Sequence, residues 1–136
     1  MSARAPKAAA RPTEAELEIL QVLWRRGPST VRAVHAALGA RTGYTTVLKL
    51  MQIMIDKGLL LRDVRERTHV YRPAHAEAQT QRRLVGELMS RAFGGSARKL
   101  VAAALASRQA SPQELDEIRK LLDDLSSNPS PKGGAS

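Results

Sequence analysis

The stretch YTTVLKLMQIMIDKG, residues 44–58, has the spacing of an amphipathic helix of about four turns. Val47, Leu50, Met51 and Met54 fall at i, i+3, i+4 and i+7, which predicts a stripe that faces the core. The opposite face carries donors, acceptors and one cation, without a carboxylate before position 56: Tyr44, Thr45, Thr46, Lys49 and Gln52. Because such a face suits contact with a polyanion, we interpret residues 44–58 as a recognition helix.

Two shorter helices are predicted before this one. Thr13-Glu14-Ala15-Glu16 has the capping-box pattern, with Thr13 as N-cap and Glu16 at N3, a structural role rather than a catalytic one. Gly27-Pro28 ends the first helix. Ser29 is expected to cap the second helix, and Gly39 to end it. Two short helices followed by a third with a polar face form a helix-turn-helix arrangement.

The pattern changes after Gly58 to that of a two-stranded hairpin. An apolar run begins at Leu59, Arg65-Glu66-Arg67 is polar and turn-like, and Thr68–Arg72 alternates until Pro73. The predicted fold class is therefore mainly α with a small β wing, a winged helix-turn-helix domain. A wing at residues 62–72 would reach a phosphate backbone while helix 44–58 enters the major groove.

Three further helices are predicted toward the C-terminus. One begins near Ala76 and breaks at Gly94-Gly95, a second covers residues 97–107, and a third begins at Ser111-Pro112-Gln113-Glu114. Each is apolar on one face, so two copies of the chain could bury those faces together, or the helices could pack onto the winged helix of a monomer. We favour the dimer. The apolar positions expected at its interface are Leu84, Leu88, Phe93, Leu100, Leu105, Leu115, Ile118 and Leu122.

The predicted domain organisation has four parts. Residues 1–12 form a disordered basic arm, and residues 13–74 the winged-helix DNA-binding domain. Residues 75–125 form a helical dimerisation domain, and residues 126–136 a disordered tail.

The charge of the chain points to a nucleic-acid partner. The net charge of the 136 residues is +9, and residues 41–73 alone carry seven cations against three acids. A basic region of this kind is the electrostatic footprint of nucleic-acid binding, and the alternative is a solvated surface that happens to be basic. No apolar run approaches the roughly 20 residues needed to span a bilayer, and the N-terminus lacks the apolar region of a secretory signal, so we expect a cytoplasmic protein.

Composition argues against catalysis and against metal or cofactor binding. The chain has no cysteine, which excludes disulfides and thiolate zinc sites, and its three histidines are scattered without ligand spacing. None of the sequence motifs of nucleophilic, phosphate-binding or zinc-dependent enzymes occurs. We therefore predict no enzyme, no metal and no cofactor.

Nine side chains are candidates for DNA contact, most of them on the recognition helix. The hydroxyls of Thr45 and Thr46 can meet phosphates or base edges, although Thr45 could also be an ordinary residue of a helix start. Leu48 could contact a thymine methyl or belong to the core. The full set is Arg41, Tyr44, Thr45, Thr46, Leu48, Lys49, Gln52, Arg65 and Arg67. For the wing arginines a solvated turn is the alternative, and Arg72 could instead form a structural salt bridge.

The ordered set of motifs resembles the penicillinase-repressor (BlaI/MecI-type) family of winged-helix transcriptional repressors. The resemblance runs from about residue 13 to residue 125. It rests on Thr13-Glu14-Ala15-Glu16 with Ile19, Leu20 and Trp24; Tyr44-Thr45-Thr46-Val47 with Leu50 and Met54; Asp56-Lys57-Gly58-Leu59; Tyr71-Arg72-Pro73; and Ser111-Pro112-Gln113-Glu114-Leu115 with Ile118. It implies a homodimer that binds a palindromic operator in double-stranded DNA.

Two properties of this family do not match the chain. Members that respond to β-lactams are cut by an inducing protease at an Asn-Phe bond in the helix after the glycine break, where Ala103-Ala104 stands here. Copper-responsive relatives use a cysteine cluster near the C-terminus, and this chain has no cysteine. The leading hypothesis is a DNA-binding transcriptional repressor, and the alternative is a winged-helix module that docks an acidic protein partner.

Overall fold

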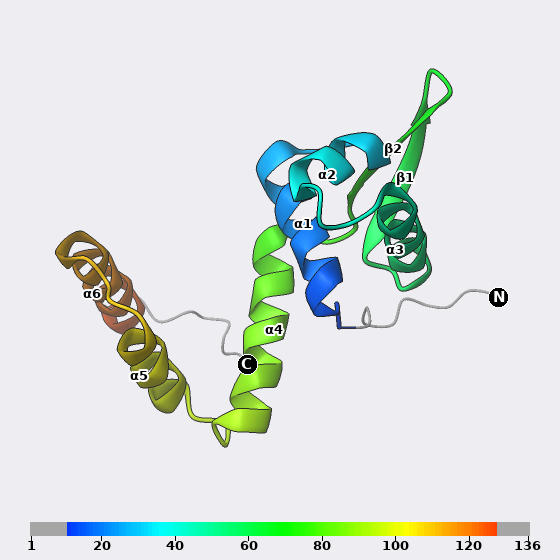
Figure 1. Cartoon of the computed structure of the whole chain (residues 1–136). Coiled ribbons are helices and arrows are strands. Elements are labelled where there is room, and N and C mark those ends of the chain that lie inside the picture. Colours follow the sequence, from blue (N-terminus) through cyan, green and yellow to red (C-terminus); the bar gives the residue numbers. More distant parts are fainter. Residues whose placement is uncertain (1–10, 128–136) are drawn as a thin grey trace. The chain divides into compact units, whose positions relative to one another are not determined.

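The computed structural model describes residues 11–127, and these form six helices and one antiparallel hairpin (Figure 1). The elements are α1 (Glu14–Arg26), α2 (Val31–Leu38), α3 (Tyr44–Asp56), β1 (Leu60–Arg65), β2 (Thr68–Pro73), α4 (Glu77–Ala92), α5 (Ala97–Ser107) and α6 (Pro112–Ser127). The prediction of a mainly α fold with a small β wing is confirmed. Most of the predicted arm lies outside the described residues. So does the predicted tail, except that residues 126 and 127 continue α6.

The chain divides into two compact units, and the boundary between them falls between Gly86 and Glu87, within α4. The first unit contains α1, α2, α3 and the wing, and the second contains α5 and α6. The predicted domains 13–74 and 75–125 place all of α4 with the C-terminal helices, and this division stays a prediction.

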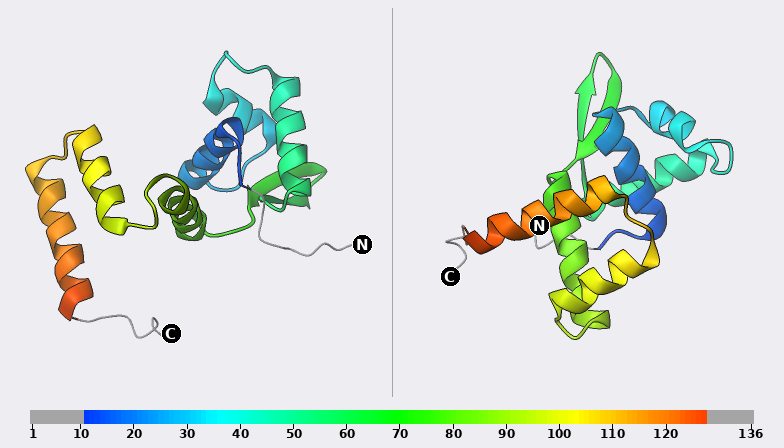
Figure 2. Two further views of the ribbon diagram at one scale, coloured as in Figure 1. Left: turned by 90° about the horizontal axis from the view of Figure 1, so that it is seen from below. Right: turned by 90° about the vertical axis from the view of Figure 1, so that its left-hand side faces the viewer.

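The core of the first unit is aliphatic except for one tyrosine. Three helices surround it and the hairpin closes one side, as the two views of Figure 2 show. Its buried side chains are Ile19, Leu20, Val22, Leu23, Val31, Val34, Val47, Met51, Met54, Leu59, Leu60 and Tyr71. Three of the four apolar residues predicted to face the core from α3 are fully buried, and Leu50 is half-buried against them.

The start of α1 has the predicted capping box. The backbone N–H of Glu16 donates to Thr13 Oγ1 at 3.2 Å, and the N–H of Thr13 donates to Glu16 Oε1 at 3.0 Å. The same carboxylate oxygen accepts a bond from Lys57 Nζ at 2.6 Å, and the Glu16 side chain is 3% exposed. One buried carboxylate thus joins the beginning of α1 to the end of α3.

The prediction that Ser29 caps α2 was wrong, because Thr30 is the N-cap. Thr30 Oγ1 accepts from the N–H of Ala33 at 3.1 Å. Ser29 is buried and extended, and it exchanges both backbone bonds with Tyr71 at 3.0 and 2.8 Å. It therefore adds a single bridge to the free edge of β2. This pairing joins residues far apart in the sequence, so no local sequence pattern predicts it.

Helix α3 ends at Asp56, two residues before the predicted limit at Gly58. Gly58 has φ +82°, its N–H donates to Ile55 O, and the N–H of Leu59 donates to Met54 O. These two bonds are those of a Schellman motif, in which glycine takes the left-handed position beyond the C-cap. Lys57 is the C-cap, so its side chain leaves the helix beside Glu16.

The wing is a hairpin of two six-residue strands with a two-residue turn. The strands pair from Leu60 opposite Pro73 to Arg65 opposite Thr68, so the wing extends beyond the predicted residues 62–72. The turn residues Glu66 and Arg67 have φ +51° and +72°. Both therefore occupy the left-handed region that Asn-Gly normally fills in such turns.

The helices after the wing lack a core within their own chain. No residue of α4, α5 or α6, all within the described range, is buried. The predicted helix starts are nevertheless formed: Ser111 Oγ accepts from the N–H of Glu114 at 3.0 Å. Capping and helix propensity favour these helices, and their apolar faces stay partly exposed.

Replacing Lys57 by methionine should lower the free energy of unfolding by about 2 kcal/mol, because the buried Glu16 carboxylate would lose its charged partner. The measurement is urea denaturation. Lys49→Met, an exposed lysine of the same helix, is the matched control and should change stability by less than about 0.5 kcal/mol. Equal effects of the two substitutions would show that the pair contributes nothing.

Replacing Glu66-Arg67 by Asn-Gly should raise the free energy of unfolding by about 1–2 kcal/mol, because both residues would then suit their left-handed backbone. Arg65→Gly, one position earlier in extended backbone, should instead lower it by about 0.5–1 kcal/mol. Urea denaturation of the two variants measures whether each substitution raises or lowers the free energy of unfolding. An Asn-Gly variant that is no more stable than the wild type would refute strain at this turn.

Candidate nucleic-acid interface

The exposed face of α3 is polar along most of its length. Tyr44, Thr45, Thr46, Lys49 and Gln52 are all exposed, and the face carries no carboxylate before Asp56. Leu48 lies beside these residues, half-buried against the core cluster. The two roles considered for Leu48 are therefore not exclusive, since it packs on the core and also lines a groove.

That groove lies between the start of α2, the start of α3 and the wing, and we call it the α2–wing groove. Its volume is about 480 Å³. The residues that line it are Thr30, Val31, Arg32, Tyr44, Leu48, Arg67, Thr68, His69 and Tyr71. The lining includes two arginines and a histidine but no carboxylate, so it presents positive charge and hydroxyl groups together.

Two side chains of α2 flank the ring of Tyr44. The guanidinium carbon of Arg32 lies 5.9 Å from the centroid of the Tyr44 ring, within the range of a cation–π contact. The His35 ring approaches the same ring edge-on, with centroids 5.8 Å apart and an interplanar angle of 88°. Tyr44 is 42% exposed and is the first residue of α3, so α2 restricts an exposed side chain at the helix start.

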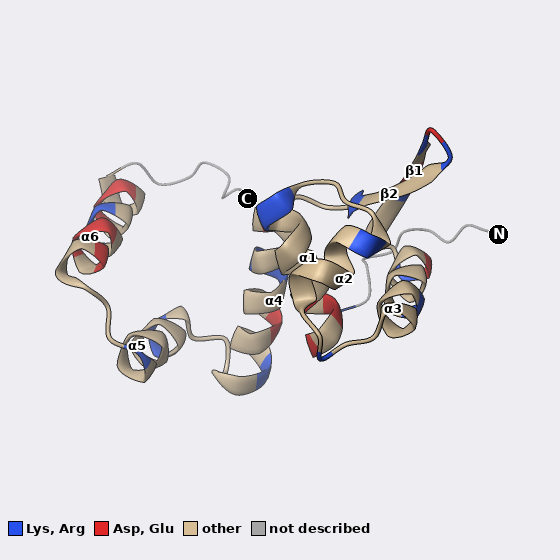
Figure 3. Cartoon of the chain, turned by 45° about the horizontal axis from the view of Figure 1, so that its top comes forward, with Lys and Arg blue, Asp and Glu red and all other residues tan. Residues whose placement is uncertain are grey.

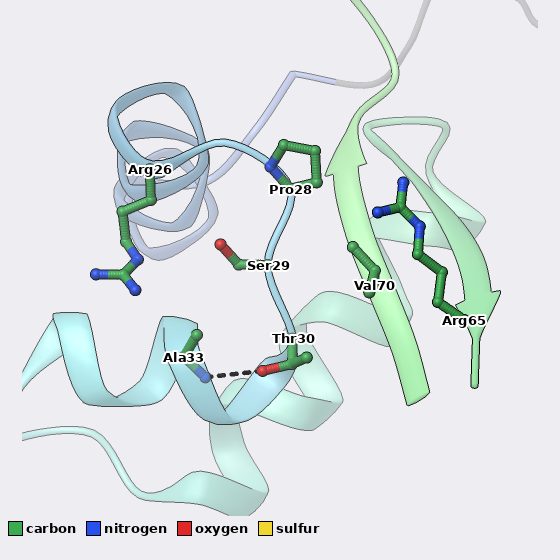
Figure 4. Close-up of a pocket in the computed structure, with 7 residues that line it drawn as sticks. All are labelled: Arg26, Pro28, Ser29, Thr30, Ala33, Arg65 and Val70. Carbon is green, nitrogen blue, oxygen red and sulfur yellow. Dashed lines mark hydrogen bonds between the residues drawn. The ribbon is translucent and has the colours of Figure 1, made fainter. Parts of the chain in front are cut away.

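Arg65 lies in a different pocket from Arg67. This second pocket is lined by Arg26, Pro28, Ser29, Thr30, Ala33, Arg65 and Val70, and its volume is about 500 Å³. In Figure 4, Arg26 lies on the α1 side and Arg65 on the wing side, with Ser29 and Thr30 between them. Since successive strand residues face opposite sides of a sheet, Val70 and Arg65 line this pocket while His69 and Tyr71 line the α2–wing groove.

The remaining predicted contacts are exposed at other positions. Arg41 lies in the turn between α2 and α3. Figure 3 shows acidic and basic segments together at the wing tip, where Glu66 separates Arg65 from Arg67. Arg72 Nε donates to Asp63 Oδ2 at 3.3 Å across the wing strands, which agrees with the structural salt bridge considered for it.

Sequence patterns did not place Arg32, His35 or His69 near the recognition helix. Arg32 and His35 are one helical turn apart on α2, a spacing that puts both on one face. Their approach to Tyr44 depends on how α2 packs on α3. The spacing alone therefore indicates that the two residues share a face of α2, but it does not indicate which residue that face contacts.

Within residues 11–127, no group of three or more His, Asp or Glu side chains is arranged to hold a metal ion. Over the same residues, no helix has both the length and the apolar character needed to cross a bilayer.

Three comparisons relate the chain to known proteins. The family model described as penicillinase repressor matches residues 12–124. Two curated proteins, each named transcriptional regulator BlaI, come from Mycobacterium tuberculosis strains CDC 1551 / Oshkosh and ATCC 25618 / H37Rv. Each is 32% identical over 126 residues, covering 88% of this chain and 91% of the relative. A solved structure of a probable transcriptional regulator from Pseudomonas aeruginosa is 22% identical, covers 83% of this chain and 77% of its own, and has a TM-score of 0.43.

The family match covers the winged-helix unit and continues almost to the end of α6. It confirms the resemblance found from the sequence motifs, and it excludes the enzyme classes, because the family is one of regulators. The chain belongs to the penicillinase-repressor family of DNA-binding transcriptional repressors.

Proposed function

We propose that the protein is a homodimeric repressor that occupies a palindromic operator, with one α3 helix in the major groove of each half-site. The observation that carries this proposal is the exposed face of α3, which bears Thr45, Thr46, Lys49 and Gln52 and has no carboxylate before Asp56. An acid-free face at a helix start can approach both base edges and phosphates. Blocking the operator by occupancy requires no catalytic group.

The contacts divide into two kinds. Thr45, Thr46 and Gln52 are assigned to base edges, because their hydroxyl, methyl and amide groups can distinguish bases in the major groove. Leu48 is assigned to the same groove as an apolar contact. The remaining predicted contacts are assigned to the phosphate backbone, and these are Arg41, Tyr44, Lys49, Arg65 and Arg67.

A homodimer follows from how little sequence one α3 helix can read. Two recognition helices held about 34–36 Å apart would read two half-sites separated by one helical turn of DNA. The exposed apolar side chains of α4, α5 and α6 support pairing of this kind: Leu88 is 49% exposed, Leu105 39% and Leu122 56%. Burial of these faces against a second copy would supply the core that the helices lack.

The alternative function is a winged-helix module that docks an acidic protein partner through the same basic surface. Both functions weaken with salt, so sequence preference is the measurement that separates them. A repressor should prefer its operator over random duplex by at least about a thousandfold. A cytoplasmic location belongs to this proposal. An inducing protease would have to cut at a bond other than Asn-Phe, because Ala103-Ala104 in α5 stands at that place.

Replacing Thr46 and Lys49 together by alanine should weaken binding to the operator and reduce the preference for it. The expected loss is about 2–4 kcal/mol on the operator. The loss on random duplex should be smaller, because only the phosphate contact of Lys49 is removed there. Gel shifts at constant salt, with promoter fragments of the protein's own and neighbouring genes, measure both affinities. Thr80→Ala with Lys99→Ala, which removes a threonine and a lysine from α4 and α5, is the matched control. Operator binding by the α3 variant as tight as that of the wild type would remove α3 from the interface.

Replacing Leu122 by lysine should raise the dissociation constant of the dimer at least about tenfold, because an unpaired charge would enter an apolar interface. Asp124→Lys introduces the same side chain half a helical turn away and serves as the control. Sedimentation velocity over a concentration series measures both. A wild-type chain that stays monomeric at all concentrations would contradict the dimer without touching the assignment of α3.

A further inference from the structure

The two walls of the α2–wing groove each carry an arginine. Arg32 comes from α2 and Arg67 from the turn of the wing, and the hydroxyl-bearing residues Thr30, Tyr44 and Thr68 line the space between them. Arginine, tyrosine and threonine side chains are among those that donate hydrogen bonds to phosphate oxygens. The groove therefore combines cations with neutral donors along a path beside the recognition helix.

Arg32 is placed differently from a surface arginine held by a salt bridge. Among the described residues it contacts the ring of Tyr44, at 5.9 Å, and no carboxylate lines the groove. Its charge is therefore not neutralised by the walls of the groove. An exposed cation that packs on an aromatic ring keeps its fork of N–H donors available to an incoming anion.

The turn of the wing gives a second, independent indication. Arg67 has φ +72° and Glu66 has φ +51°, a backbone conformation that is unfavourable for both residue types. This conformation nevertheless leaves the Arg67 side chain on the wall of the groove. Strain that places a cation beside an acid-free groove is the kind of local cost that accompanies a binding role.

We propose that the α2–wing groove binds one phosphodiester strand of DNA, and that Arg32 both contacts this strand and positions Tyr44 for the same purpose. This inference rests on the proposed DNA-binding function and extends it from α3 and the wing to α2. A contact with phosphate carries no sequence information, so Arg32 contributes to affinity on every duplex equally.

The test measures how affinity for a random-sequence duplex falls with salt. Arg32→Met should make the slope of log K against log salt concentration shallower by about one for each protomer bound, because one counterion fewer is released. Affinity for operator and for random duplex should fall by the same factor. Arg32→Lys keeps the charge and should keep the wild-type slope.

Arg98→Met is the matched control, since it removes an exposed arginine from α5 in the second unit and should leave the slope unchanged. An Arg32→Met slope equal to that of the wild type would overturn the groove assignment. Because the measurement uses random duplex, it stays valid even where no operator preference is found. The proposed repressor function is tested separately by that preference.

The positioning role of Arg32 has its own readout. In a double-mutant cycle with Arg32→Met and Tyr44→Leu, the combined loss of affinity should be smaller than the sum of the single losses, because removing Arg32 already disturbs the tyrosine contact. Fully additive losses would refute the positioning role.

Discussion

The winged-helix unit depends on the pairing of one buried carboxylate. Glu16 closes the capping box of α1 and also accepts a 2.6 Å bond from Lys57, just past the end of α3. A charge that is 3% exposed must be paired, because its desolvation is otherwise uncompensated. The requirement therefore fixes the start of α1 against the end of α3. The ion pair holds the C-terminal end of α3. The exposed hydroxyl and cationic side chains lie nearer the N-terminal end of this helix.

Interactions between residues close together in the sequence could be predicted, whereas contacts between residues far apart in the sequence could not. The capping residues Thr13 and Ser111 were predicted because their partners lie three positions away. Ser29 looked like a third case of the same pattern, but its backbone bonds go to Tyr71, and the neighbouring Thr30 takes the cap. The contact of Lys57 with Glu16, 41 positions earlier, was not predicted either, because it also depends on the packing of distant elements.

The candidate site shows the same division. The structure gathers Tyr44, Leu48 and Arg67 along one groove but separates Arg65, two positions before Arg67, into another pocket. Residues two positions apart in one strand share a face, but the left-handed turn at Glu66 and Arg67 breaks this alternation, so the spacing of Arg65 and Arg67 cannot assign the face. Arg32 was not predicted as a site residue, because nothing in the sequence around an exposed arginine of a short helix indicates that it contacts Tyr44 of α3.

The bridge between Ser29 and Tyr71 has a thermodynamic consequence. It ties strand β2 of the wing to the segment that starts α2, and Tyr71 is buried in the same core as α3. The wing base, α2 and α3 are therefore ordered together before DNA arrives, and this unit loses little conformational entropy on binding. When such a preordered unit binds DNA, the heat capacity should change only by the amount that burial of the contact surface accounts for. Coupled folding would add a further and greater decrease in heat capacity, which calorimetry can distinguish.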